Sequence, residues 1–134
     1  ANTELWNGSS WTEVNNLNTA RYELTGDGDS STAVIAFGGS SQKAVTETWN
    51  GTNWTEVNDL ATGRRALGMS GATNTASLAF GGYTGTASNS TEEYNGSGWG
   101  AGGNLGTARY QGAGAGTQTA GLKMAGQGPP RTPR

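Results

Sequence analysis

The ionisable residues that recur at regular steps along this chain are three arginines and three glutamates: Arg21, Arg64, Arg109, Glu4, Glu47 and Glu92. A ring of arginines could bind an anionic ligand. Each arginine could instead lock its own repeat, through an ion pair with a glutamate or by stacking on a tryptophan. Because every repeat places these residues in the same way, we expect a structural role for all six.

A second candidate is the segment Asp27-Gly28-Asp29-Ser30, whose oxygen ligands around a glycine would suit a calcium ion. The next copy of the repeat carries Ser70 and Ala72 at the matching positions. No glutamate follows at the distance that a bidentate calcium ligand requires. We therefore predict a solvated turn in this segment and no metal site.

Histidine and cysteine are absent from the chain. Zinc and blue-copper sites, and nucleophile pairs of the Ser-His or Cys-His kind, need these residues. A pair of carboxylates could still hydrolyse glycosides, but Glu92 and Glu93 would point to opposite faces of a strand. We therefore predict no catalytic residues, no cofactor and no enzymatic activity.

The composition indicates short strands joined by many turns. Of the 134 residues, 32% are hydrophobic, 24 are glycine, 13% are charged and five are tryptophan. Disordered chains combine few aromatic residues with high net charge, so we expect an ordered chain. The net charge of −2 argues against a nucleic-acid partner. No apolar run approaches the roughly 18 residues that a membrane span needs, so we expect no membrane partner.

One sequence pattern occurs three times. Thr3–Asn15 returns almost unchanged as Thr46–Asn58 and in shortened form as Thr91–Trp99. The first aromatic residue of the pattern moves 43 positions, from Trp6 to Trp49, and then 45 positions to Tyr94. A repeat of this size is one supersecondary unit that buries its apolar face by stacking on its copies.

The middle repeat predicts four short antiparallel strands. Residues 65–70 form a first stretch, a turn follows at Gly71–Asn74, and residues 75–80 alternate large and small side chains as a strand does. A third strand at Glu92–Tyr94 turns through an Asn-Gly pair, the strongest short hairpin signal, into a fourth around Trp99. Four such strands per repeat are typical of a β-propeller blade.

The order of motifs resembles the kelch repeat. Gly-Gly, a variable loop, Glu-x-aromatic, a hairpin, Trp, Leu and Arg follow one another in two copies: Gly38-Gly39, Glu47, Trp49, Trp54, Leu60, Arg64, and Gly81-Gly82, Glu92, Tyr94, Trp99, Leu105, Arg109. Trp11, Trp54 and Trp99 hold one structural position of this repeat. In the last copy the double glycine is replaced by Ala125-Gly126.

This resemblance implies an all-β, kelch-like propeller of the kind found in the central domain of galactose oxidase. The copper ligands of that enzyme include His and a Cys-linked Tyr, which cannot be carried over to a chain without His and Cys. The repeats are also similar to kelch-like repeats of marine phage virion proteins, which favours an extracellular or virion-associated location. In kelch propellers the first strand of each blade lines a central channel, and we place the small residues Gly112–Gly116 there rather than in a linker.

The repeats divide the chain into a half blade at 1–20, blades at 21–63 and 64–108, a half blade at 109–127, and a Pro/Arg tail or linker at 128–134. The total is three blade-equivalents, whereas a propeller ring needs about four to eight. We therefore expect a six-bladed ring closed by a homodimer, so that the chain is its own partner. The alternative is that these residues are a fragment of a longer single-chain propeller.

The loops that differ between copies are the candidate binding residues: Ser40, Ser41, Gln42, Lys43, Tyr83, Thr84 and Asn89. Tyr83 lies among Thr, Ser and Asn, a setting that suits stacking on a sugar ring. We expect a non-enzymatic structural or recognition module for a protein or a receptor, in a phage virion or tail for example. A lectin-like propeller that binds a glycan is the alternative.

Overall fold

The computed structural model describes residues 1–129, and these residues form twelve strands and no helix. The strands make four separate antiparallel sheets and no closed barrel. This confirms the all-β prediction. Within residues 1–129 we find no apolar helix of membrane-spanning length. The greater part of the predicted tail, residues 130–134, lies outside the described residues.

Two of the sheets are complete four-stranded meanders. The first has the order β3-β4-β5-β6, with β3 at Thr25–Ser30, β4 at Ala33–Phe37, β5 at Thr46–Trp49 and β6 at Trp54–Val57. The second has the order β7-β8-β9-β10, with β7 at Gly68–Thr73, β8 at Ala76–Phe80, β9 at Thr91–Tyr94 and β10 at Trp99–Ala101. Both meanders run in chain order without a crossover.

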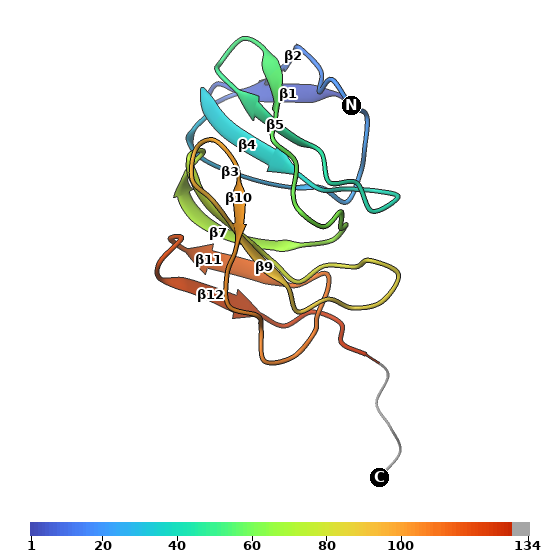
Figure 1. Cartoon of the computed structure of the whole chain (residues 1–134). Helices are drawn as coiled ribbons and strands as arrows, with labels where there is room; N and C mark the ends of the chain where they lie inside the picture. The colour runs from blue at the N-terminus through green and yellow to red at the C-terminus, as the bar shows by residue number, and fades with distance from the viewer. Residues whose placement is uncertain (130–134) are drawn as a thin grey trace.

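The other two sheets are hairpins near the two ends of the described chain. The first hairpin pairs β1 (Thr3–Trp6) with β2 (Trp11–Val14). The second pairs β11 (Ala113–Gly116) with β12 (Gly121–Met124). Figure 1 shows β1 and β2 at one end of the stack of sheets, and β11 and β12 at the other.

The Asn-Gly pairs form the hairpins that the sequence predicts. In the β5–β6 turn, the side-chain oxygen of Asn50 accepts hydrogen bonds of 2.9 Å from the N–H groups of Thr52 and Asn53. Gly51 follows with φ of 96°, a backbone conformation that strains residues with a Cβ. The same bonds recur at Asn7 and Asn95. Local turn chemistry therefore fixes the strand register of each copy.

Two predicted turns are wrong. Strand β7 continues through the predicted turn to Thr73, so the chain reverses at Asn74-Thr75. A register shift between Gly71 and Thr73 lets the strand absorb an extra residue and continue. Likewise, the predicted solvated turn at Asp27–Ser30 lies inside β3, where the carboxylate of Asp27 accepts a 3.1 Å hydrogen bond from the Ser77 hydroxyl.

The sheets stack side by side through their first strands, since β7 lies between β3 and β11. Small residues make this approach possible. A Cβ placed on Gly114 of β11 would lie 2.0 Å from the carbonyl oxygen of Met69 in β7. The glycine-rich segment after Tyr110 is therefore a packed strand, β11, rather than a linker.

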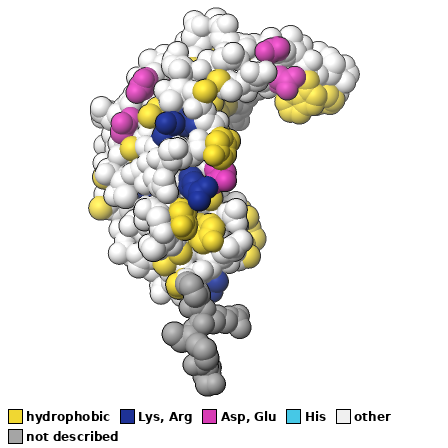
Figure 2. All heavy atoms as spheres, turned by 90° about the vertical axis from the view of Figure 1, so that its right-hand side faces the viewer, with side chains coloured by type: hydrophobic (Ala, Val, Ile, Leu, Met, Phe, Trp, Pro, Cys, Tyr) yellow, Lys and Arg dark blue, Asp and Glu magenta, His cyan; other side chains and the backbone are white. Residues whose placement is uncertain are grey.

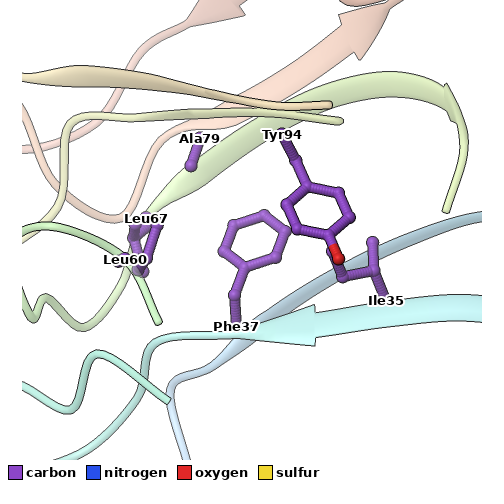
Figure 3. Packing of buried hydrophobic residues seen from close by; sticks show 6 residues of the cluster. All are labelled: Ile35, Phe37, Leu60, Leu67, Ala79 and Tyr94. Carbon is purple, nitrogen blue, oxygen red and sulfur yellow. The ribbon is translucent and has the colours of Figure 1, made fainter. Parts of the chain in front are cut away.

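The main core lies between the two four-stranded sheets. Its buried members are Ile35, Phe37, Leu60, Leu67, Ala79 and Tyr94. Figure 3 shows Ile35 and Phe37 extending from β4 toward Tyr94. The Phe37 ring also meets the edge of the Trp99 ring, 4.9 Å away between centroids. Burial of each large apolar side chain contributes about 1.5–3 kcal/mol, so the stability of one sheet depends on its neighbour.

Candidate functional site

Positions whose side chains differ between the repeats meet just before the first strand and just after the second strand of neighbouring sheets. In the last two copies, the residue after the recurring arginine pairs through its backbone with the residue after the Gly-Gly or Ala-Gly pair. Arg65 and Tyr83 exchange hydrogen bonds of 3.2 and 2.8 Å, and Tyr110 and Gln127 exchange bonds of 2.8 and 2.7 Å. The same backbone pair thus carries Arg and Tyr in one sheet and Tyr and Gln in the next.

These side chains form a connected row, which we call the variable row: Glu23, Arg65, Tyr83, Tyr110 and Gln127. Arg65 Nη1 lies 3.1 Å from Glu23 Oε2, and its guanidinium carbon lies 4.8 Å from the centre of the Tyr83 ring. The Tyr83 ring packs at 61° on the Tyr110 ring with centroids 5.1 Å apart. The Tyr110 hydroxyl donates to Gln127 Oε1 at 2.7 Å.

A groove of about 650 Å³ lies at the tyrosine end of the variable row. Tyr83, Tyr110 and Gln127 line it together with the loop Gly85–Ala87 and with Gly128 and Pro129. Figure 2 shows basic, acidic and hydrophobic side chains close together along the middle of one face of the molecule. Aromatic faces beside amide and hydroxyl groups can bind a ligand that has both an apolar face and polar edges.

The ion pair in the variable row is open to solvent. The side chains of Arg65 and Glu23 are 34% and 35% exposed, and such pairs contribute roughly 0–1 kcal/mol. The buried Nε of Arg65 has no hydrogen-bond partner among the described residues. The ion pair therefore adds little to the stability of the fold, and its charged groups are accessible to a ligand.

The recurring arginines Arg21 and Arg64 are buried instead. Arg21 Nη1 lies 2.6 Å from Glu47 Oε2, and Arg64 Nη2 lies 2.7 Å from Glu92 Oε2. Both arginine side chains are 0% exposed, so neither can contact a ligand from solvent. Burial lowers the pKa of the Arg64 guanidinium, and the charge of Glu92 and its hydrogen bond to the guanidinium oppose that shift.

The third arginine and the first glutamate lie in different surroundings. Arg109 is half-buried, and within the described part of the chain its Nη1 donates to one acceptor, the Gly126 carbonyl oxygen, at 3.4 Å. Glu4 is exposed on β1. Neither forms an ion pair within residues 1–129.

Two of the three recurring tryptophans link a sheet to the one before it in the chain. Trp54 Nε1 of β6 donates to Thr3 Oγ1 of β1, and Trp99 Nε1 of β10 donates to Thr46 Oγ1 of β5, both at 3.1 Å. Trp11 holds the same position in β2 and is 63% exposed. Trp54 and Trp99 therefore join adjacent sheets.

The predicted loop residues lie on two different connections. Ser40, Ser41, Gln42 and Lys43 belong to the β4–β5 loop, where Ser40 is buried and the Lys43 N–H closes a turn onto the Gly39 carbonyl at 3.0 Å. Tyr83, Thr84 and Asn89 belong to the β8–β9 loop. Of these seven residues, Tyr83 belongs to the variable row, where it contacts Arg65 and Tyr110.

Sequence reasoning missed four members of the variable row: Glu23, Arg65, Tyr110 and Gln127. A signal for them exists, because the residue after the recurring arginine is Tyr22, then Arg65, then Tyr110. When the side-chain type at one position differs between otherwise near-identical repeats, that position is more typical of a binding residue than of a residue that holds the fold. Within the described residues, no group of three or more His, Cys, Asp or Glu could hold a metal ion.

No family model matches this chain, and no curated protein is similar to it.

Proposed function

We propose that this chain is a kelch-like β-propeller module that binds a protein or a receptor and has no enzymatic activity. Two copies of its three blade-equivalents would close a six-bladed ring. Two observations support a propeller: two meanders of the same strand order, and stacking through their first strands. The absence of His and Cys supports a role without metal or nucleophile chemistry.

The observation that carries the binding proposal is the variable row. Tyr and Arg are the residue types that dominate protein–protein recognition, because each combines a large contact area with polar groups. Arg65, Tyr83 and Tyr110 bring three such side chains into contact on adjacent sheets. The buried ion pairs keep the scaffold constant beneath them. The likeness of the repeats to phage virion proteins would place such a surface on a particle.

A random peptide library displayed on phage tests this proposal without knowledge of the natural partner. Peptides selected on the immobilised chain should lose binding when Tyr83→Ala and Arg65→Ala are introduced together. The matched control is Thr55→Ala, at an exposed position on β6 away from the row. Selected peptides that bind the Tyr83/Arg65 variant as well as the unmodified chain would contradict a recognition role for the row.

A lectin is the second candidate, and the groove beside Tyr83 favours it. Sugar rings stack on aromatic faces while their hydroxyls bond to amides, and Tyr83, Tyr110 and Gln127 supply both. A glycan array probed with the labelled chain should give hits that Tyr83→Ala abolishes. An array without hits would remove the lectin candidate and leave the protein-binding proposal standing.

A further inference from the structure

The two hairpins at the ends of the described chain correspond to the two halves of one complete sheet. In the complete sheets, β4 is followed by β5 with Ile35, Ala36 and Phe37 opposite Thr48, Glu47 and Thr46. By repeat position, Leu122, Lys123 and Met124 of β12 correspond to Ile35, Ala36 and Phe37. Likewise Thr3, Glu4 and Leu5 of β1 correspond to Thr46, Glu47 and Thr48.

The side chains that are buried in the complete sheet are exposed in the hairpins. Leu122 and Met124 are 61% and 41% exposed, whereas Ile35 and Phe37 are both 0% exposed. Trp6 is 47% exposed, whereas Trp49, its counterpart in β5, is 4% exposed. An exposed apolar edge of this kind is a site of association.

A pocket next to β1 fits the exposed side chains of β12. It has a volume of about 450 Å³, its lining is largely apolar, and the indole rings that line it are Trp6, Trp11, Trp49 and Trp54. Trp54 in this pocket corresponds to Trp99, and the Phe37 ring fills the space against Trp99 between the two complete sheets. The space against Trp54 is where the counterpart of Phe37, Met124, would lie. Figure 2 shows hydrophobic side chains gathered beneath the overhang at the upper end, where Figure 1 places β1 and β2.

The charges at the two edges are also complementary. Arg64 donates to Gly81 O, Ser90 O and Glu92 Oε2 at 2.7–2.8 Å. Within residues 1–129, its counterpart Arg109 makes one side-chain hydrogen bond, to Gly126 O at 3.4 Å. Lys123 lies close enough to Arg109 that, beside the larger effect of burial, the arginine charge lowers the lysine pKa. Among the described residues, no acid pairs with this cationic edge as Glu92 pairs with Arg64, while Glu4 is exposed at the opposite edge.

We propose that β12 of one copy pairs antiparallel with β1 of a second copy, in the register that joins β4 to β5. Leu122 then lies opposite Leu5 of the partner subunit, and Lys123 lies opposite Glu4 of the partner subunit. Leu122 and Met124 fill the indole-lined pocket, and Arg109 forms an ion pair with Glu4 of the partner subunit. This inference rests on the proposed two-copy ring and specifies the contacts that close it.

A second copy is the occupant because each edge matches the other edge of the same chain. Two copies arranged head to tail form this contact twice and leave neither edge open, as closed symmetry requires. Each closure would bury four side chains that are now 41–63% exposed: Trp6, Trp11, Leu122 and Met124. A foreign strand would have to reproduce both the apolar alternation of β12 and the cation between its two apolar residues.

Cross-linking of cysteine variants tests the register, and the chain contains no native cysteine to interfere. Leu5→Cys and Leu122→Cys are made as separate chains, mixed in equal amounts and oxidised. We expect a disulfide-linked dimer that contains one chain of each kind. The control pairs Leu5→Cys with Lys123→Cys, since adjacent strand residues point to opposite faces, and should not cross-link.

A charge variant tests the ion pair. Glu4→Gln should raise the dissociation constant at least tenfold in sedimentation equilibrium, because it leaves Arg109 and Lys123 without their acid. Glu13→Gln is the matched control, since Glu13 faces Glu4 across the β1–β2 hairpin and is also exposed. Circular dichroism establishes that each variant is folded.

The outcomes separate this inference from the ring itself. A dimer with the Leu5–Leu122 cross-link and sensitivity to Glu4→Gln supports both. A dimer without that cross-link overturns the proposed register and leaves the two-copy ring in place. A folded monomer at all concentrations overturns the ring and this inference together.

Discussion

Replacing the buried arginine Arg64 tests whether the recurring ion pairs hold the fold or serve binding. Arg64 makes hydrogen bonds of 2.7–2.8 Å to Glu92, Gly81 and Ser90, and its side chain is 0% exposed. Arg64→Ala removes all three and leaves the Glu92 carboxylate, itself 5% exposed, without its counter-charge. Loss of one partner of a buried pair costs about 3–5 kcal/mol.

For a chain of this length, about 1 kcal/mol corresponds to a shift of roughly 3–4 °C in the melting temperature. Arg64→Ala should therefore lower the melting temperature by roughly 10–18 °C. Thermal unfolding followed by circular dichroism measures this shift. The Ala61 N–H that donates to Glu92 at 2.6 Å offsets part of the loss, which favours the lower end of that range.

The double variant Arg64→Met with Glu92→Met supplies the control. When both charges are replaced by apolar groups of similar size, no ion is left unpaired, and buried pairs often tolerate this change with little loss of stability. We expect the double variant to melt well above Arg64→Ala. An unchanged melting temperature for Arg64→Ala, together with lost peptide or glycan binding, would refute the structural role.

Three further predictions concern stability. Burial raises the pKa of the Asp27 carboxyl above its ordinary value of 3.8, because the folded state binds the proton more tightly than the unfolded state does. Protonation of Asp27 therefore stabilises the fold fully below pH 3.8, and this contribution is lost as the pH rises through the raised pKa. Asp27→Asn should remove this pH dependence, so the melting temperature of the variant should change less between pH 3 and 7 than that of the unmodified chain. The same change of melting temperature with pH in both proteins would contradict the prediction. Phe37→Ala should cost about 3–5 kcal/mol in urea unfolding because the ring is fully buried against Trp99, and a cost below 1 kcal/mol would argue against a core between sheets. Gly8→Ala should cost about 1 kcal/mol through backbone strain alone, since φ is 102° and nothing lies within 4 Å of the added Cβ; an equal or higher melting temperature would contradict this.

The sequence predicts the hairpins well because their signal is local. Asn50 and Gly51 set both the side-chain hydrogen bonds and the positive φ of the turn, whatever packs around them. The all-β class and the four-stranded meanders follow from repetition of this unit, since alternation fixes which side of each strand is buried.

Features that depend on neighbouring sheets could not be predicted in the same way. Strand β7 continues past Gly71 because a bulge and packing against β3 replace the turn that its small polar residues suggest. Asp27 of β3 pairs with Ile35 of β4, and a hydroxyl on the next sheet, Ser77, donates a hydrogen bond to the Asp27 carboxylate. The variable row joins three sheets through side chains that are distant in sequence, so a search for variable loops found only Tyr83.

Small-angle X-ray scattering from the 134-residue chain at several concentrations tests the central claim most directly, because it reports mass and shape together. If the sheets stack into a ring closed by two copies, the forward scattering corresponds to twice 13.6 kDa, and the distance distribution is that of a compact disc. A mass of one chain with the elongated profile of an open arc, at every concentration, would contradict the account.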